Sequence, residues 1–250
     1  MEFRNGGVKP RMLKLAIVLQ ARLDSGRLPE KTMLPLGAKP LIFRVMEALN
    51  QVPADLRILA CTEDSKKAFA PFATEAGFEL MSGPKENVLE RYCLVIRKYG
   101  ICRLIRATGD NPFVFADAAA AINAQGLAIG ADYAGFAGLP YGAGVESVKA
   151  SALLHAGNEA ESTYEQEHVC PYLYGHPEKF LLHRPLAPFR WQAPALRLTV
   201  DTKEDYERAA ALYAILNECG AERYRGNTII EAAAKLFLTE TQRPQRRSDQ

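Results

Sequence analysis

The sequence predicts an α/β protein whose mostly parallel central sheet is covered by helices on both faces. Continuous apolar runs, typical of strands that are buried on both sides, alternate with amphipathic stretches through the first half of the chain. Glycines follow several of these amphipathic stretches, where helices commonly end. No unit of about 20 to 50 residues is repeated, which excludes solenoids and propellers.

The first half of the chain contains the regular part of this pattern. Apolar runs predict parallel strands at 13–19, 57–61 and 102–107. Apolar residues spaced three and four apart predict helices at 41–51, 65–77, 87–99 and 113–125. Gly77, Gly100 and Gly126 are expected at helix C-caps. The alternation of strands and helices predicts right-handed crossover connections.

The second half of the chain is less regular. Short strands are expected at 132–136, 144–149, 180–184 and 196–200. Helices are expected at 151–161, 164–176, 203–218 and 228–238, and Thr202 or Asp201 is expected to cap the helix that begins at 203. We expect 13–238 to form a single domain between an N-terminal extension, 1–12, and a disordered tail, 239–250, which lacks an apolar stripe.

Composition and charge exclude several classes of protein. Hydrophobic residues make up 48% and charged residues 24% of the chain, as in ordinary globular proteins. The formal net charge of +2 gives no electrostatic reason to expect nucleic acid or an anionic membrane surface as a partner. The five cysteines contain no C-x-x-C pair, so we expect reduced thiols and a cytoplasmic protein. The apolar stretches are interrupted well before the ~20 residues that span a bilayer.

The segment that follows the first strand, QARLDSGRLPEK at 20–31, predicts a phosphate-binding loop. Ligands of open α/β sheets bind beyond the carboxyl ends of the strands, where this segment begins. Ser25 and the glycine after it allow a close approach of the backbone, and three cationic side chains surround them: Arg22, Arg27 and Lys31. The glycine motifs of P-loop and dinucleotide-binding proteins are absent from the sequence, which disfavours kinases, GTPases and simple dehydrogenases. A solvated basic loop is the alternative interpretation.

Two aspartates at the ends of apolar runs predict a metal site. Asp110 follows the strand at 102–107, and Asp201 ends the run LTVD. Aspartates at the carboxyl edge of one sheet can hold Mg²⁺ against a bound triphosphate. Each aspartate also has a purely structural interpretation, because Asp110 precedes the turn residue Pro112 and Asp201 precedes a helix.

Several separate stretches resemble one family of enzymes. QARLDSGRLPEK followed by MLPLGAKPLI is similar to the nucleotide-binding signature of the cytidylyltransferases that activate acidic sugars, namely sialic acid and 3-deoxy-manno-octulosonate. Other stretches resemble the spore coat polysaccharide biosynthesis protein F branch of this family: GPKENVLERY, RLIRATGDNP, LPYGAGVES, YEQEHVCPYLYGHPEKF and RLTVDTKEDYE. The resemblance extends from about Leu13 to Tyr213.

The resemblance implies a GT-A-like nucleotide-diphospho-sugar transferase fold and a homodimer. It also implies a Mg²⁺-dependent transfer of CMP from CTP to a sugar-type acceptor, with release of pyrophosphate, for the biosynthesis of surface polysaccharide or glycoconjugate. The implied catalytic residues are Arg22, Lys31, Asp110 and Asp201, with both aspartates binding the metal. The implied nucleotide-binding residues are Gln20, Ala21, Arg22, Ser25, Arg27, Lys31, Thr62, Ser82, Asn87, Arg106 and Asp110. The implied acceptor-binding residues are Tyr141, Glu146, Glu167 and His168.

The sequence departs from the family pattern at a few positions. Glu30 stands where glycine is usual, and Asp24 stands where a small residue is common, so both add negative charge beside the phosphate site. Asn87 replaces a frequent aspartate, and Asn111 replaces a small residue or cysteine. Two alternative functions remain open. A glycosyltransferase is disfavoured because the sequence has no D-x-D triplet, and a degenerate nucleotide-binding protein is favoured by the two added carboxylates.

Overall fold

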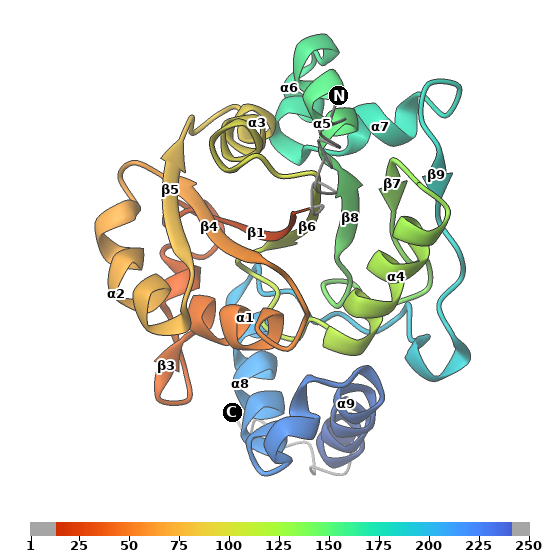
Figure 1. The fold of residues 1–250 in the computed structure, drawn as a ribbon. Helices are drawn as coiled ribbons and strands as arrows, with labels where there is room; N and C mark the ends of the chain where they lie inside the picture. The colour runs from red at the N-terminus through yellow and green to blue at the C-terminus, as the bar shows by residue number, and fades with distance from the viewer. Residues whose placement is uncertain (1–13, 242–250) are drawn as a thin grey trace, which may run out of the picture.

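A seven-stranded sheet forms the centre of the part of the chain that the computed structural model describes, residues 14–241 (Figure 1). The strand order is β5-β4-β1-β6-β8-β7-β9. The bounds are β1 (Leu15–Ala21), β4 (Leu56–Thr62), β5 (Glu79–Gly83), β6 (Arg103–Thr108), β7 (Tyr133–Ala134), β8 (Glu146–Lys149) and β9 (Leu182–His183). Only β8 runs antiparallel to its neighbours within this sheet, so the prediction of a mostly parallel sheet is confirmed.

Helices cover both faces of the sheet, as the sequence predicts (Figure 1). One face packs against α1 (Leu41–Leu49), α2 (Lys66–Ala76), α4 (Ala116–Ala128), α8 (Lys203–Asn217) and α9 (Gly226–Thr241). The other face packs against α3 (Val88–Tyr99), α5 (Ala150–Glu159) and α7 (Pro171–Gly175), with α6 (Thr163–His168) beside them. Short elements complete the fold: the hairpin β2 (Pro35–Leu36) and β3 (Lys39–Pro40), and the 3₁₀ turns η1 (Lys31–Met33), η2 (Phe189–Trp191) and η3 (Gly220–Tyr224).

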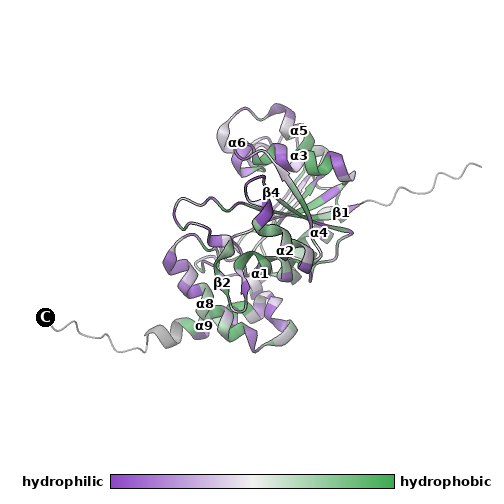
Figure 2. Ribbon diagram, turned by 90° about the vertical axis from the view of Figure 1, so that its left-hand side faces the viewer, coloured by the Kyte–Doolittle hydropathy of each residue, from purple (hydrophilic) through white to green (hydrophobic). Residues whose placement is uncertain are grey.

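The strand β1 lies in the middle of the core. Its side chains alternate between the two layers, with Ile17 and Leu19 in one apolar cluster and Ala16 and Val18 in the other, and all four are fully buried. A strand that is covered on both faces needs apolar residues at every position, which explains the continuous run in the sequence. Figure 2 shows the resulting distribution, with hydrophobic residues concentrated on the strands and on α1 in the interior.

The predicted helix ends are confirmed at two glycines and wrong at a third. Gly77 and Gly100 follow α2 and α3 with φ of 75° and 62°, the left-handed conformation of a C-cap. Gly126 lies inside α4 instead. A Cβ atom at this position would stand 2.7 Å from the Cβ of Ala134 on the adjacent strand, so the position has no room for a side chain. Close packing of α4 on the sheet therefore explains this glycine.

Three expected elements differ in the structure. The helix expected at 164–176 is divided into α6 and α7, because Val169 has a φ of 76° and Pro171 begins the second helix. The expected strand 196–200 is extended backbone with one isolated bridge, between Arg197 and Tyr141, and it is not a strand of the sheet. The helix expected at 113–125 begins later, at Ala116.

The structure also identifies the residue that caps α8 and places the C-terminal end of the last helix. Thr202, not Asp201, caps α8, and its hydroxyl accepts a hydrogen bond from the backbone N–H of Asp205 at 3.2 Å. The helix α9 continues to Thr241 and so includes 239–241, which were expected to belong to the tail. The rest of that tail and the expected N-terminal extension, 1–12, lie outside the described residues. Between residues 14 and 241, none of the helices combines the length and the apolar character needed to cross a membrane.

Candidate active site

A cleft of about 900 Å³ opens at the carboxyl ends of β1 and β6. Open α/β sheets bind ligands at this edge, because the loops that leave the parallel strands meet there. The structure brings most of the predicted site residues together along its walls: Gln20, Ala21, Arg22, Ser25, Arg27, Lys31, Arg106, Asp110, Tyr141, Glu146, Glu167, His168 and Asp201. Three predicted nucleotide-binding residues, Thr62, Ser82 and Asn87, are not among the lining residues.

These three residues have structural surroundings that the sequence does not reveal. The Thr62 hydroxyl is buried and lies 2.7 Å from the hydroxyl of Ser65, which accepts a hydrogen bond from the backbone N–H of Leu23. Thr62 therefore supports the loop that follows β1. Asn87 caps α3, where its side chain accepts a hydrogen bond from the N–H of Glu90 at 2.8 Å. Ser82 lies in β5, the edge strand of the sheet.

Lys31 joins the two predicted metal-site aspartates. Its ammonium nitrogen lies 2.8 Å from Oδ2 of Asp110 and 2.8 Å from Oδ1 of Asp201. Arg27 reaches the same oxygen of Asp201 at 3.0 Å. Burial alone would raise the pKa of Asp201, but the hydrogen bonds and positive charges of its partners outweigh burial and hold this pKa below its ordinary value. Asp201 is therefore a carboxylate at neutral pH.

The donor set fits a divalent cation that shares its coordination with a phosphate ligand. The Lys31 ammonium lies between the carboxylates of Asp110 and Asp201, so a single cation reaches both of them. Among residues 14–241, no cluster of three or more acidic, histidine or cysteine side chains is arranged to hold a metal. Mg²⁺ commonly binds through one or two carboxylates plus substrate phosphates and water. Asp110 and Asp201 match that type of site.

Arg197 and Asp205 belong to this environment and were missed by the sequence analysis. Arg197 donates a hydrogen bond from Nη2 to Oδ2 of Asp201 at 2.6 Å, and its guanidinium lies over the ring of Tyr141, 5.0 Å from the centroid. Asp205 pairs with Arg197 in turn. The available signal was the spacing of four residues between Arg197, Asp201 and Asp205. A spacing of four residues brings side chains together in a helix but not in an extended segment, so the sequence alone does not predict that these three residues are in contact.

Another part of the cleft lining contains a partly buried ion pair. Arg106 donates a hydrogen bond to the carboxylate of Glu146, and the hydroxyl of Tyr133 donates to the other oxygen of that carboxylate at 2.9 Å. Burial and the charge of Glu146 raise the pKa of Tyr133 far above its ordinary value, so Tyr133 remains a protonated donor. Tyr133 was also missed, because a tyrosine in a short strand resembles any other core residue.

Loop 22–30 is connected to the wall of the cleft by an exposed ion pair. Arg22 lies 3.4 Å from Glu167, and their side chains are 45% and 51% exposed. His168, next to Glu167, packs its ring against Tyr164 with centroids 4.6 Å apart. These contacts bring predicted nucleotide-binding and acceptor-binding residues into one cleft.

The structure accounts for three of the unusual residues in the sequence. Asp24 forms an ion pair with Lys85 at 2.7 Å, and this hydrogen bond and charge lower the pKa of Asp24. Glu30 has a φ of 51°, the left-handed conformation that glycine adopts most readily. Asn111 donates a hydrogen bond to the Thr108 hydroxyl at 2.8 Å, so it stabilises the turn beside Asp110.

Comparisons with known proteins identify relatives of this chain. The sequence profile of the family described as Cytidylyltransferase matches residues 16–235. The spore coat polysaccharide biosynthesis protein SpsF of Bacillus subtilis (strain 168) is 34% identical over 209 residues, which cover 81% of this chain and 87% of that protein.

Solved structures with the same fold include a cytidylyltransferase from Leptospira borgpetersenii serovar Hardjo-bovis (strain JB197). It superposes with a TM-score of 0.81 at 24% identity, over 90% of this chain and 96% of that one. A CMP:2-keto-3-deoxy-manno-octonic acid synthetase in complex with CTP superposes with a TM-score of 0.64 at 18% identity, over 80% of this chain and 98% of that one. The fold is therefore the one seen in these nucleotidyltransferases.

Proposed function

Because the chain belongs to the cytidylyltransferase family, we propose that it transfers CMP from CTP to a sugar-type acceptor, with Mg²⁺ as cofactor and pyrophosphate as the second product. The observation that carries this proposal is the convergence of Lys31, Asp110 and Asp201 at the carboxyl edge of the sheet. Family membership favours nucleotidyl transfer over the alternative of glycosyl transfer. The ion pair between Asp24 and Lys85 weakens the argument for a degenerate binding protein.

The reaction requires alignment and charge neutralisation more than covalent chemistry. A hydroxyl oxygen of the acceptor forms a bond to the α-phosphorus of CTP, while the bond from this phosphorus to the oxygen bridging the α- and β-phosphates breaks. The electron pair of the broken bond leaves with pyrophosphate, and the hydroxyl proton is released. Arg22, Arg27 and Lys31 line the cleft where they can offset the charge on the leaving pyrophosphate.

Binding of the nucleotide would exchange one set of ion pairs for another. In the structure, Arg22, Arg27 and Lys31 each contact a carboxylate of the cleft. Phosphate oxygens can replace these carboxylates as partners of the cations, which leaves Asp110 and Asp201 available to hold Mg²⁺. When bound there, Mg²⁺ supplies Lewis-acid polarisation of the phosphate oxygens. The three cations thus keep anionic partners when the nucleotide binds.

The acceptor would bind on the side of the cleft that Tyr141, Glu146, Glu167 and His168 line. Carboxylates and imidazoles hydrogen-bond to sugar hydroxyls, and the exposed ring of Tyr141 offers an apolar face. SpsF of Bacillus subtilis is named for spore coat polysaccharide biosynthesis. We therefore propose that the product of this enzyme serves surface polysaccharide or glycoconjugate biosynthesis.

We also propose a homodimer in the cytoplasm. All five cysteines lie within the described residues and are free thiols, which supports a reducing compartment. The homodimer rests on the family resemblance. Light scattering coupled to gel filtration measures the mass in solution, and a mass near twice 27.6 kDa is expected.

The experiment that tests the proposed function has two stages. The first is a thermal-shift series with Mg²⁺ and each of CTP, UTP, ATP and GTP, because a ligand that binds only the folded state raises its stability. The second measures pyrophosphate released from CTP with a panel of sugar acceptors. We expect a shift selective for CTP, and pyrophosphate release that depends on Mg²⁺.

Two variants complete this experiment. Asp110→Asn should abolish turnover with a thermal midpoint near that of the wild type. Glu75→Gln is the matched control, because Glu75 pairs with Lys39 and does not line the cleft. Turnover by Asp110→Asn at the wild-type rate, or no CTP-dependent shift in the wild type, would overturn the proposal.

A further inference from the structure

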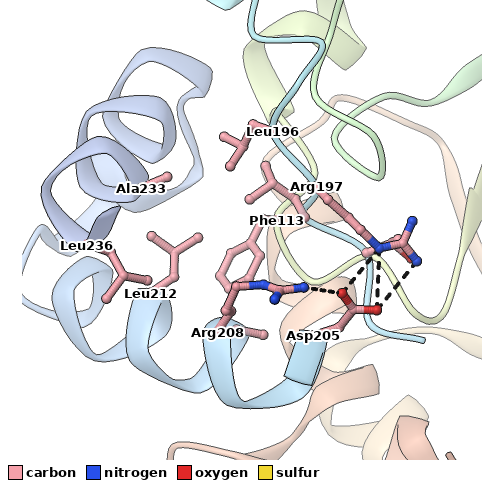
Figure 3. Close-up of a pocket in the computed structure, with 11 residues that line it drawn as sticks. Phe113, Leu196, Arg197, Asp205, Arg208, Leu212, Ala233 and Leu236 are labelled. Carbon is pink, nitrogen blue, oxygen red and sulfur yellow. Dashed lines mark hydrogen bonds and ion pairs between the residues drawn. The ribbon is translucent and has the colours of Figure 1, made fainter. Parts of the chain in front are cut away.

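Asp205 is a buried carboxylate at the start of α8, with its side chain 4% exposed. It lies outside the cleft and lines a small pocket of about 20 Å³ between α8, α9 and the segment 196–199 (Figure 3). Its side chain accepts hydrogen bonds from two arginines and two backbone N–H groups, namely Arg197, Arg208, Asp201 and Thr202. A helix cap alone requires only the Thr202 contact. The other contacts need a separate explanation.

The two arginines approach Asp205 from opposite sides (Figure 3). Arg208 lies on α8 and donates to Oδ1 of Asp205 at 2.5 Å. Arg197 lies on the extended segment and donates to the same oxygen from Nε at 3.2 Å. Only Arg197 continues toward the cleft, since its Nη2 donates to Oδ2 of Asp201 at 2.6 Å. A guanidinium presents its donors in one rigid plane, so the contact with Asp205 fixes the direction in which Arg197 meets Asp201.

Asp205 thereby holds Asp201 in two ways, directly through a hydrogen bond and indirectly through Arg197. Its backbone N–H donates to Oδ2 of Asp205 at 3.0 Å, and its side-chain Oδ2 is occupied by Arg197. The other oxygen, Oδ1, faces Lys31 and Arg27 in the cleft. The carboxylate of Asp201 therefore has one oxygen bound to Arg197 and the other oxygen directed toward the cations of the cleft.

We propose that Arg197 and Asp205 are positioning residues, which together present a single oxygen of Asp201 to the cation in the cleft. The proposal rests on the proposed function, because it takes Asp201 to be a metal ligand. Mg²⁺ demands near-ideal octahedral geometry, and residues that orient metal ligands commonly change metal affinity about 10- to 100-fold when they are replaced. Asp205 thus connects the packing of α8 with the geometry of the metal site.

The variants that test this proposal separate positioning from stability. Asp205→Asn keeps the shape of the side chain and one acceptor for the backbone, but it removes the charge that holds Arg197. Arg197→Lys keeps the positive charge, but an ammonium lacks the rigid plane of donors by which the guanidinium contacts Asp205 and Asp201 in a fixed direction. Two controls leave the contact between Arg197 and Asp201 intact. Thr202→Ala removes the cap of α8, and Arg208→Gln removes the other arginine on Asp205.

The main readout is metal binding without turnover. Mn²⁺ is titrated into each protein in the presence of CTP and the absence of acceptor, and free Mn²⁺ is measured by electron paramagnetic resonance. We expect Asp205→Asn and Arg197→Lys each to weaken Mn²⁺ binding about 10- to 100-fold. The variant carrying both changes should be no weaker than the worse single variant, because the two residues act as one unit. Thr202→Ala and Arg208→Gln should bind Mn²⁺ as the wild type does.

The thermal midpoint without metal or nucleotide shows whether each variant is folded. If Asp205→Asn and Arg197→Lys bind Mn²⁺ with wild-type affinity, the positioning role is wrong and Asp205 serves only to stabilise α8. If the controls weaken binding as much as these two variants do, a general loss of stability explains the effect and the proposal is again overturned. If the wild type itself binds no Mn²⁺ with CTP, the proposed function fails first and the positioning role fails with it.

Discussion

The ammonium nitrogen of Lys31 lies 2.8 Å from Oδ1 of Asp201, although 170 positions separate these residues in the sequence. The same ammonium contacts Asp110 at 2.8 Å. Lys31 thus offsets the repulsion between these two carboxylates. In the proposed reaction, the same side chain turns to the triphosphate. Lys31 therefore pairs with both aspartates in the structure and has a separate role in the proposed reaction.

Replacement of Lys31 by methionine should reduce turnover strongly. Loss of a preorganised charge at a reacting group commonly lowers kcat about 10²- to 10³-fold. Steady-state kinetics of pyrophosphate release measure the effect. Lys39→Met is the control, because Lys39 pairs with Glu75 outside the cleft. A kcat for Lys31→Met within twofold of the control would show that Lys31 has no part in the chemistry.

Replacement of Glu30 by glycine should stabilise the protein. Glu30 has a φ of 51°, where a side chain with a Cβ atom is strained and glycine is not. We expect a gain of about 1 kcal/mol in the free energy of unfolding, after the greater flexibility of glycine in the unfolded chain is subtracted. Urea denaturation measures it. Glu30→Ala removes the same charge without relieving the strain, so an equal gain in both variants would assign the effect to charge.

Replacement of Glu167 by glutamine should increase the affinity for CTP at low salt. Glu167 holds Arg22 at 3.4 Å, so this pair must open before Arg22 can reach a phosphate. An exposed ion pair contributes at most about 1 kcal/mol, which limits the gain to about fivefold. Calorimetric titration with CTP measures it, with Glu161→Gln as the control. The gain should vanish at high salt, and a gain that persists there would contradict an electrostatic origin.

The buried thiols predict a loss of stability in alkaline solution. Burial raises the pKa of Cys61 and of Cys93 to about 11, from an ordinary value of 9.0. The folded state thus holds these protons more tightly than the unfolded state. The stabilisation is complete below pH 9 and declines as the pH rises toward 11.

At pH 10 this effect should lower the free energy of unfolding on the order of 1 kcal/mol for each thiol. Urea denaturation at pH 8 and pH 10 measures it, and Cys61→Ala should show a smaller difference between the two pH values than the wild type. An identical difference in the variant and the wild type would assign the alkaline loss to other groups, such as buried tyrosines.

Parts of this protein could be predicted from the sequence because local physical rules govern them. A strand that is buried on both faces must be apolar at each position, and β1 follows that rule. Gly77 and Gly100 end helices because they adopt a left-handed backbone at little cost. The loop that follows β1 was identified by its three cations, and the structure places it on the cleft.

Other parts could not be predicted, because one residue type serves several roles. Asn87 and Thr62 are polar residues beside strand ends, which suits both a ligand site and a structural hydrogen bond. The structure places Asn87 at a helix cap and Thr62 beneath a loop. The segment 196–200 has the composition of a strand, but its backbone bonds to Tyr141 and Asp110 and makes no ladder.

The sequence by itself determined where the carboxylates and cations stand along the chain and which of them follow strands of a parallel sheet. Only the tertiary structure decided their partners: Lys31 for Asp110, and Arg197 and Asp205 behind Asp201. The physical reason is that strand and helix patterns arise from neighbours a few residues apart. An ion pair depends on a distance of a few ångströms between side chains, which packing of the whole chain sets.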